Sequence, residues 1–181
     1  MAVYLHQAQR SLRQVNVVTR DRYTIPFQLP DGYNDKGTHY IGSGTYGIVI
    51  RTHVVPTCMN PRRERAEMEA AIKKINRPME SMRMAQLCYR ELMLLKNLDH
   101  PNIARLVDMY TSARHPNELL DVYLVMEYVG SSLDAQLAES IKDKYAYVPM
   151  TSIPRVIHDT LRALEYLMHA EVLHRDLKPA N

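Results

Sequence analysis

Residues 172–181 carry side chains whose types and spacing can do chemistry, in the order Val-Leu-His-Arg-Asp-Leu-Lys-Pro-Ala-Asn. The carboxylate of Asp176 can accept a proton from a hydroxyl group, and the ammonium group of Lys178 can neutralise negative charge that develops beside it. The amide oxygen of Asn181 is a hard ligand of the kind that Mg²⁺ binds. The segment therefore predicts a polar loop that can take up a proton and stabilise an anion.

Glycines occupy positions 42, 44 and 47 in the pattern G-x-G-x-x-G-x-V, which ends at Val49. Dinucleotide-binding turns share this glycine spacing, but they run from a strand into a helix. Residues 48–55 are instead rich in β-branched side chains, which favour a second strand. We therefore expect a β-hairpin, in which the absence of side chains lets the backbone approach a phosphate group closely.

A strand is predicted over residues 69–75, Glu-Ala-Ala-Ile-Lys-Lys-Ile. Because side chains alternate between the two faces of a strand, Lys73 shares a face with Ala71 and Ile75, and Lys74 lies on the other face. The two adjacent lysines therefore cannot share a role. We expect Lys74 to point into solvent, and without a partner Lys73 would be an ordinary edge-strand lysine.

The segment 81–98 is predicted to be a helix, because apolar residues recur at helical spacing: Met84, Leu87, Cys88, Leu92, Leu95 and Leu98. Glu91 falls inside this apolar stripe. A carboxylate on an apolar face is costly unless it is paired, so Glu91 is expected to have a basic partner. Glu80 and Glu69 are poorer candidates for such a pair, because no apolar residues surround them.

Two further segments are expected to hold these residues in place. Residues 119–129 are apolar on both faces of the strand alternation, which indicates a buried strand. Residues 151–170 form the clearest predicted helix, with an apolar stripe and a capping residue at Thr151 or Ser152. Pro154 falls in its first turn, where proline is tolerated. This helix leads directly into the polar loop.

Two other segments are less regular. Residues 1 to about 24 mix arginines with short apolar pieces, and the pattern leaves open whether they form an edge strand or a peptide arm. Residues 56–68 are polar and charged, and they predict an exposed insertion in a hairpin. Contact of that insertion with a partner is the less favoured alternative.

Four motifs in one order resemble those of the eukaryotic protein kinases. They are the glycine pattern, the Ala-Ala-Ile-Lys strand, the helix that carries Glu91, and the His-Arg-Asp-Leu-x-x-x-Asn loop. The resemblance covers about residues 27–181. A lysine two positions after Asp176 is typical of serine/threonine kinases, and Tyr-Arg-Glu-Leu at 89–92 resembles the mitogen-activated protein kinases.

The resemblance implies a site for ATP and Mg²⁺. Asp176, Lys178, Lys73 and Glu91 would be the catalytic residues, with Asp176 accepting the proton of the substrate hydroxyl. Glu91 would pair with Lys73 and fix it for binding the phosphates, and Asn181 would hold the metal. The nucleotide would be bound by Ile41, Gly42, Ser43, Gly44, Thr45, Tyr46, Gly47, Val49, Ala71, Lys73, Met126, Glu127, Val129 and Ser132.

Some of these roles follow only from the register of the resemblance. Met126 would gate the pocket behind adenine, and the main chain of Glu127 and Val129 would read the edge of the base. Ser132 departs from the family, which often has an acidic residue near this position to hold the ribose. Its hydroxyl would bind the ribose more weakly or cap the next helix. His174 is expected to pack and to form hydrogen bonds rather than to act as a base.

The implied fold is α+β and protein-kinase-like, with an antiparallel small lobe that contains one key helix and the first helices of a truncated helical large lobe. We expect an N-terminal arm over residues 1–26, the small lobe and hinge over 27–129, and the start of the large lobe over 130–181. The sequence contains no Asp-Phe-Gly and no Ala-Pro-Glu. We therefore expect an incomplete kinase domain whose 181 residues alone are inactive. The alternative is an inactive, truncated kinase-like module that competes for kinase partners.

Composition narrows the class of partner. The net charge of +3 is too small and too dispersed to require a nucleic acid. Cys58 and Cys88 stand alone, so we expect a reducing compartment and no structural zinc. No apolar run approaches the ~20 residues of a membrane span. We expect a soluble, cytoplasmic protein, with the nucleus as a second compartment, that is monomeric when complete. Its implied partners are protein substrates and an upstream kinase.

Overall fold

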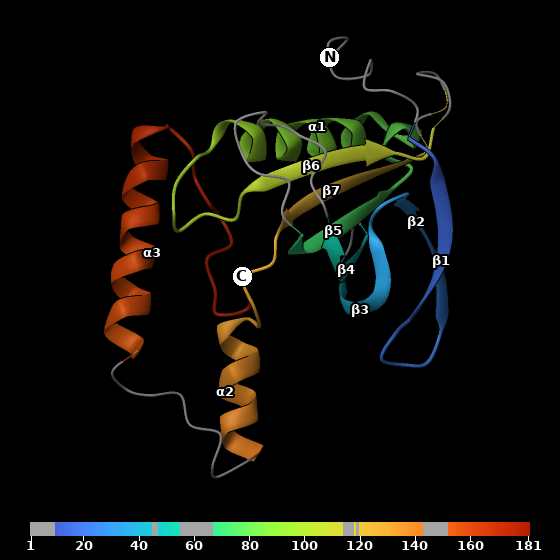
Figure 1. Ribbon diagram of the computed structural model, residues 1–181. Coiled ribbons are helices and arrows are strands. Elements are labelled where there is room, and N and C mark those ends of the chain that lie inside the picture. The colour runs from blue at the N-terminus through green and yellow to red at the C-terminus, as the bar shows by residue number, and fades with distance from the viewer. Residues whose placement is uncertain (1–9, 45–46, 55–66, 114–117, 119, 143–151) are drawn as a thin grey trace. The chain divides into compact units, whose positions relative to one another are not determined.

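The computed structural model describes residues 10–44, 47–54, 67–113, 118, 120–142 and 152–181. Strands dominate the first part of the chain and helices the last part, which confirms the α+β class (Figure 1). The chain divides into two compact units: residues 1–97 with 105–128, and residues 98–104 with 129–181. No helix in the described ranges is long and apolar enough to cross a membrane.

The first unit is built on a five-stranded antiparallel sheet with the strand order β3-β4-β5-β7-β6. The strands are β3 (Asn34–Gly44), β4 (Gly47–Val54), β5 (Met68–Asn76), β6 (Leu106–Thr111) and β7 (Asp121–Glu127). The pairing of β3 with β4 confirms the predicted glycine hairpin. In β7, four consecutive residues from Val122 to Val125 are buried, as expected for a central strand covered on both faces.

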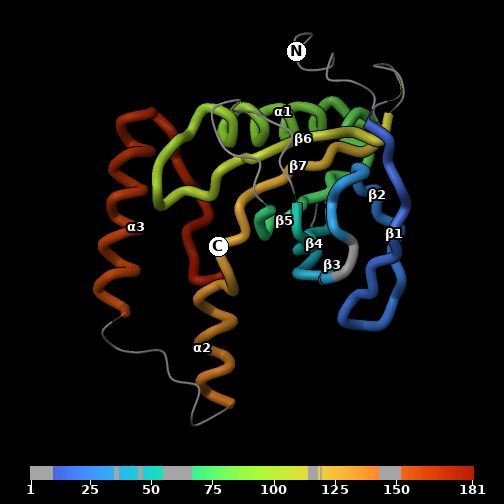
Figure 2. Tube along the Cα trace, viewed as in Figure 1, coloured from blue at the N-terminus to red at the C-terminus, as the bar shows by residue number. Residues whose placement is uncertain are grey.

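A separate hairpin, β1 (Leu12–Val18) and β2 (Thr24–Pro30), covers one face of this sheet and leads directly into β3 (Figure 2). The N-terminal segment, which the sequence left open, is thus a two-stranded hairpin in its described part. Since β2 continues to Pro30, the expected arm boundary at residue 26 falls inside a strand. Phe27 and Tyr110 both pack against Tyr123, Phe27 edge-on and Tyr110 stacked with ring centroids 4.5 Å apart. Aromatic burial of this kind ties the hairpin to the sheet.

The buried carboxylate of Asp108 links the sheet to the residues that flank the β1–β2 hairpin. Asp108 on β6 is 1% exposed, and its Oδ2 accepts hydrogen bonds from Arg10 Nη1 at 2.5 Å and from the Tyr33 hydroxyl at 2.6 Å. Its Oδ1 accepts the backbone N–H of Met109 at 2.8 Å. Burial, together with the nearby carboxylate, raises the pKa of Tyr33 far above its usual value, so Tyr33 remains a hydrogen-bond donor.

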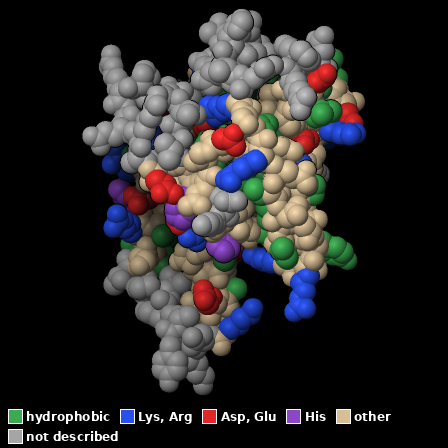
Figure 3. Space-filling view, turned by 45° about the vertical axis from the view of Figure 1, so that its right-hand side comes forward, with side chains coloured by type: hydrophobic (Ala, Val, Ile, Leu, Met, Phe, Trp, Pro, Cys, Tyr) green, Lys and Arg blue, Asp and Glu red, His purple; other side chains and the backbone are tan. Residues whose placement is uncertain are grey.

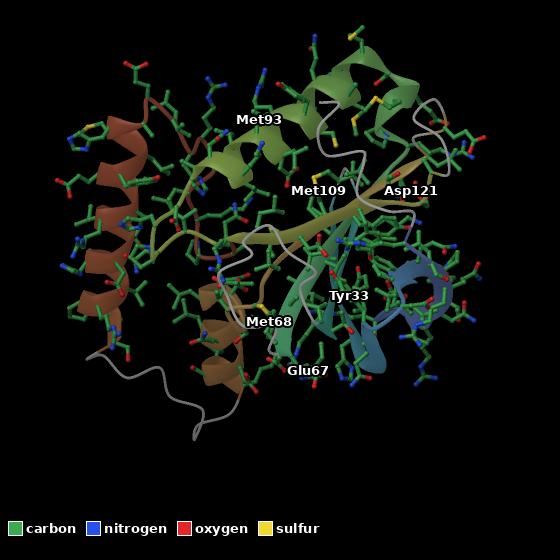
Figure 4. The ribbon with its side chains drawn as sticks, turned by 45° about the horizontal axis from the view of Figure 1, so that its top comes forward. Tyr33, Glu67, Met68, Met93, Met109 and Asp121 are labelled. Atoms are coloured by element: carbon green, nitrogen blue, oxygen red, sulfur yellow. The ribbon has the colours of Figure 1, made fainter. Side chains whose placement is uncertain are left out.

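The predicted helix over 81–98 is confirmed as α1 (Met82–Asn97), preceded by the short turn η1 (Pro78–Glu80). Ser81 caps α1, because its Oγ accepts the backbone N–H of Met84 at 3.1 Å. The apolar stripe of α1 packs on the second face of the sheet, where Met109 of β6 lies (Figure 4). Cys88 is buried there, and burial raises the pKa of its thiol.

The second unit contains α2 (Leu133–Lys142) and α3 (Ser152–His169), and α3 confirms the helix predicted over 151–170. A Schellman motif ends α3: Val172 N–H donates to the Leu167 carbonyl and Glu171 N–H to the Met168 carbonyl. Glu171 has a φ of 56°, the left-handed conformation that this motif requires. Most of the predicted apolar stripe of α3 is exposed in this chain: Ile153, Val156, Ile157, Leu161 and Met168.

Candidate active site

Lys73 and Glu91 form the predicted ion pair, with Lys73 Nζ 2.5 Å from Glu91 Oε1. Lys73 comes from β5 and Glu91 from the face of α1 that packs on the sheet. Their side chains are 24% and 33% exposed, so the pair is shielded from water more than a surface pair is. The rejected candidates pair elsewhere, Glu80 with Arg77 and Glu69 with Arg51.

The prediction that Lys74 points into solvent is wrong. Its Nζ lies 3.1 Å from Asp121 Oδ2, and its side chain is only 13% exposed. Strand alternation correctly put Lys74 on the face opposite to Lys73, but that face packs against the ring of Tyr123, 5.9 Å from Nζ. Asp121, at the start of β7 (Figure 4), also accepts the backbone N–H of Arg77. The sequence offered no local signal for this contact, because 47 residues separate the two partners.

The strand register brings four predicted nucleotide-site residues to one face of the sheet. Val49 on β4 is directly opposite Lys73, and Ala71 is directly opposite Met126 on β7. Opposed residues of antiparallel strands project to the same face. Because Ala71 and Lys73 already share a face, all four side chains lie on the face that α1 covers. Met126 packs against the apolar cluster beneath that helix.

The glycine hairpin shows two kinds of glycine. A Cβ atom at Gly47 would collide with the carbonyl oxygen of Lys74, so close strand pairing itself requires glycine there. At Gly42 and Gly44, no described atom of the chain lies within 4 Å of such a Cβ. The other predicted residues of β3 have local partners: Ile41 O accepts Arg20 Nη2 at 3.5 Å, and Ser43 Oγ accepts the Tyr40 hydroxyl at 2.9 Å. Thr45 and Tyr46 lie outside the described residues.

The predicted base-reading segment begins at the end of β7. Glu127 is the last residue of the strand, and its N–H donates to the Arg105 carbonyl at 3.0 Å. Val129 follows in the second unit, with an 81% exposed side chain. Ser132 precedes α2 directly, and its hydroxyl donates to the Asp134 carboxylate at 2.6 Å. The structure thus shows Ser132 at the cap position, with its main-chain carbonyl accepting the N–H of Gln136.

The polar loop of the second unit joins its three predicted residues. Lys178 Nζ lies 2.8 Å from Asp176 Oδ2, and Asn181 Nδ2 donates to the same oxygen at 2.9 Å and to the Asp176 carbonyl at 2.8 Å. The amide nitrogen of Asn181 therefore faces Asp176, and its amide oxygen, the atom that can bind a cation, faces away. His174 Nδ1 accepts the N–H of Asp176 at 3.3 Å, which fits the predicted hydrogen-bonding role.

The electrostatics of this loop favour an ionised Asp176. The hydrogen bond from Lys178, followed by that from Asn181, lowers the pKa of Asp176 below its usual value. Asp176 is exposed, so solvent screens these interactions, and the shift marks the protonation state rather than a large stabilisation of the fold. An ionised carboxylate at neutral pH is the form that can accept a proton.

A strained backbone residue shapes the same loop. Arg175 has a φ of 65°, a left-handed conformation that is uncommon for a residue other than glycine. Strain of this kind costs on the order of 1–3 kcal/mol and clusters at functional sites. By its resemblance to the protein kinases, Arg175 matches the arginine that contacts a phosphorylated activation loop, and no pattern in the sequence predicted its left-handed backbone.

The antiparallel sheet with a helix packed on it in the first unit, and the helices of the second unit, fit a protein-kinase-like α+β fold. Residues 36–181 match the family model "Protein kinase domain". The chain belongs to the protein kinase domain family.

Its relatives place it with the mitogen-activated protein kinases. It is 36% identical over 161 residues to mitogen-activated protein kinase pmk-3 of Caenorhabditis elegans, covering 87% of this chain and 32% of that protein. It is 33% identical over 156 residues to mitogen-activated protein kinase 14 of Xenopus laevis, covering 86% and 38%. For human mitogen-activated protein kinase 13 the identity is 32% over 170 residues, covering 94% and 42%. The chain is thus serine/threonine-kinase-like and of the mitogen-activated type by family, and it spans about two fifths or less of the length of these relatives.

Proposed function

We propose that the protein containing this chain transfers the γ-phosphoryl group of ATP to serine or threonine hydroxyls of protein substrates. The observation that carries the proposal is the Lys73–Glu91 ion pair at 2.5 Å. A lysine held by a carboxylate on the face of the sheet that also carries Val49, Ala71 and Met126 is suited to orienting the phosphates of a nucleotide.

The glycine hairpin supports the same proposal. Gly42 and Gly44 have no described protein neighbour that would exclude a side chain, in contrast to Gly47. Close approach of a phosphate to the backbone accounts for glycine at these two positions. Met126 would limit the space behind the adenine, and the main chain of Glu127 and Val129 would bind its edge.

The second unit would supply the proton acceptor. Asp176 is held ionised by Lys178, and it would take the proton of the attacking hydroxyl as the new O–P bond forms. Lys178 would stabilise negative charge on the transferred group. Asn181 offers an amide oxygen for Mg²⁺, which neutralises phosphate charge when it is bound. An upstream kinase as activator, and a cytoplasmic and nuclear location, remain predictions from the family.

The test is phosphoryl transfer by the full-length protein that contains this chain. The protein is incubated with Mg²⁺, radiolabelled ATP and a generic protein substrate rich in serine and threonine. We expect labelled phosphoserine or phosphothreonine, and a rate lowered about 10²–10³-fold in Lys73→Met.

Lys74→Met is the matched control. It removes the adjacent lysine, which contacts Asp121 on the other face, and its rate should stay within a few-fold of the wild type. Equal rates for the wild type and Lys73→Met would refute the proposal. Absence of transfer with intact binding of kinase partners would favour the inactive binding module instead.

A further inference from the structure

Two ion pairs and one ring contact meet at the last residues of the first unit. Arg51 on β4 pairs with Glu69 on β5, and the Arg51 guanidinium lies over the ring of Tyr128, 4.9 Å from its centroid. Arg105, directly before β6, pairs with Glu127 at the end of β7. We call these five residues, Arg51, Glu69, Arg105, Glu127 and Tyr128, the hinge bracket.

The bracket holds the end of β7 from both faces of the sheet. Glu69 and Arg51 share the face of Ala71, because Arg51 is directly opposite Ala71 and Glu69 is two residues away on the same strand. Glu127 is directly opposite Ala70, which puts the Arg105–Glu127 pair on the other face. The side chains therefore restrain this strand end in both directions normal to the sheet.

Backbone hydrogen bonds continue the same restraint. Glu127 N–H donates to the Arg105 carbonyl at 3.0 Å, and Tyr128 N–H donates to the Glu69 carbonyl at 3.3 Å. Each of these backbone contacts joins residues that also belong to a side-chain pair of the bracket. The main chain at 127–128 is thus tied to Glu69 of β5 and to Arg105, directly before β6.

Stability alone does not account for this arrangement. The four paired side chains are 29–38% exposed, and partly solvent-screened ion pairs of this kind contribute only modestly to folding. Their common feature is location: both pairs act on the residues with which the first unit ends before the chain continues at Val129. Acidic and basic side chains are interspersed over the described surface in view in Figure 3, so ion pairs are expected elsewhere too. What distinguishes these two pairs is that both contact the same end of strand β7 or the residue after it.

We propose that the hinge bracket positions the main-chain groups of residues 127–129 for recognition of the adenine base. This inference rests on the proposed nucleotide site. The bracket residues do not bind the base with their side chains; they act by fixing the backbone carbonyl and N–H groups that do. Guanine presents a different pattern of hydrogen-bond donors and acceptors along the same edge as adenine. A fixed backbone cannot adapt to that pattern, so the bracket favours ATP over GTP, and loosening the backbone lowers this preference.

The test compares dissociation constants for ATP and GTP in the full-length protein that contains this chain, by competition with a fluorescent ATP analogue. Glu127→Gln removes one charge and keeps the side chain's shape, and Arg105→Gln removes the opposite charge and shortens the side chain. We expect each to raise the dissociation constant for ATP about two- to fivefold, the range of measured exposed pair energies, and to lower the ATP preference over GTP. The charge-reversed double variant Arg105→Glu with Glu127→Arg should restore much of that preference.

Arg77→Gln is the matched control, since Arg77 and Glu80 form an ion pair away from the hinge with both side chains more than 60% exposed. It should leave both dissociation constants unchanged. Equal weakening of ATP and GTP in the bracket variants would show a merely structural role and overturn the inference. Unchanged dissociation constants for ATP and GTP in folded bracket variants, checked by circular dichroism, would also overturn the inference. The proposed function would still stand in that case if Lys73→Met lost activity. If the wild type binds no ATP, both proposals fail.

Discussion

Lys73 Nζ and Glu91 Oε1 lie 2.5 Å apart, and this contact joins the central strand β5 to helix α1. Eighteen residues separate the two in sequence. The contact places a fixed cation on the sheet face that also carries Val49, Ala71 and Met126.

Glu91→Gln should lower the phosphoryl-transfer rate about tenfold or more, because a charge-assisted hydrogen bond to Lys73 is replaced by a neutral one. The effect should be smaller than that of Lys73→Met, since the lysine itself remains. Glu80→Gln is the control: this carboxylate pairs with exposed Arg77, and its loss should leave the rate unchanged. Steady-state kinetics of the full-length protein would measure all three. Similar rates for Glu91→Gln and Glu80→Gln would contradict the assignment.

Met126→Gly should open the space behind the adenine. Met126 lies opposite Ala71 and packs against the apolar cluster under α1, so removal of its side chain leaves a gap on the nucleotide face. We expect ATP analogues with a bulky substituent on the adenine amino group to become substrates for the variant. Met109→Ala removes a methionine that packs against the same cluster from β6, and it should not admit those analogues. Failure of Met126→Gly to change analogue selectivity would mean that the hinge register is wrong.

The protonation of Asp176 should depend on Lys178. Because Lys178 and Asn181 lower the pKa of Asp176, the carboxylate stays ionised as pH falls through the usual range for aspartate, near 3.9. Lys178→Met should raise that pKa toward its usual value, measured by NMR titration of the Asp176 carboxyl carbon. Since the pKa in the folded protein is depressed, its contribution to stability is present above the unfolded value and is lost only at more acidic pH. An unchanged titration midpoint in Lys178→Met would exclude the contact in solution.

Asp108 should be important for folding rather than for chemistry. It is 1% exposed and binds Arg10, Tyr33 and the backbone of Met109. Asp108→Ala breaks a buried charged network, which typically costs about 3–5 kcal/mol. We expect a large fall in melting temperature, whereas Tyr33→Phe, which removes one hydrogen bond, should cost about 1–3 kcal/mol. Arg77→Ala, on an exposed pair, should be within about 0.5 kcal/mol of the wild type. Equal melting temperatures for Asp108→Ala and Arg77→Ala would contradict this.

Local patterns in the sequence predicted the elements that position the site. The helical spacing of apolar residues gave α1 and α3, and the β-branched run after the glycines gave the β3–β4 hairpin. The need of Glu91 for a basic partner followed from its place inside an apolar stripe. The resemblance to the protein kinases, and not the stripe, identified Lys73 as that partner. The elements themselves were predictable because their deciding patterns lie within a few residues.

Contacts between distant segments were decided only by the tertiary structure. The prediction for Lys74 was wrong because alternation cannot tell whether the second face of a strand meets water or another layer. The β1–β2 hairpin and Tyr123 cover that face of the sheet and make it a second core. Arg10 and Asp108 are 98 residues apart, and nothing local to either predicts their contact. The hinge bracket joins residues of strands β4, β5 and β7 with Arg105 and Tyr128 just outside the strands, and sheet order sets which of these strands are neighbours. Such pairings depend on which segments the folded chain buries together, a property of the whole sheet rather than of any short stretch of sequence.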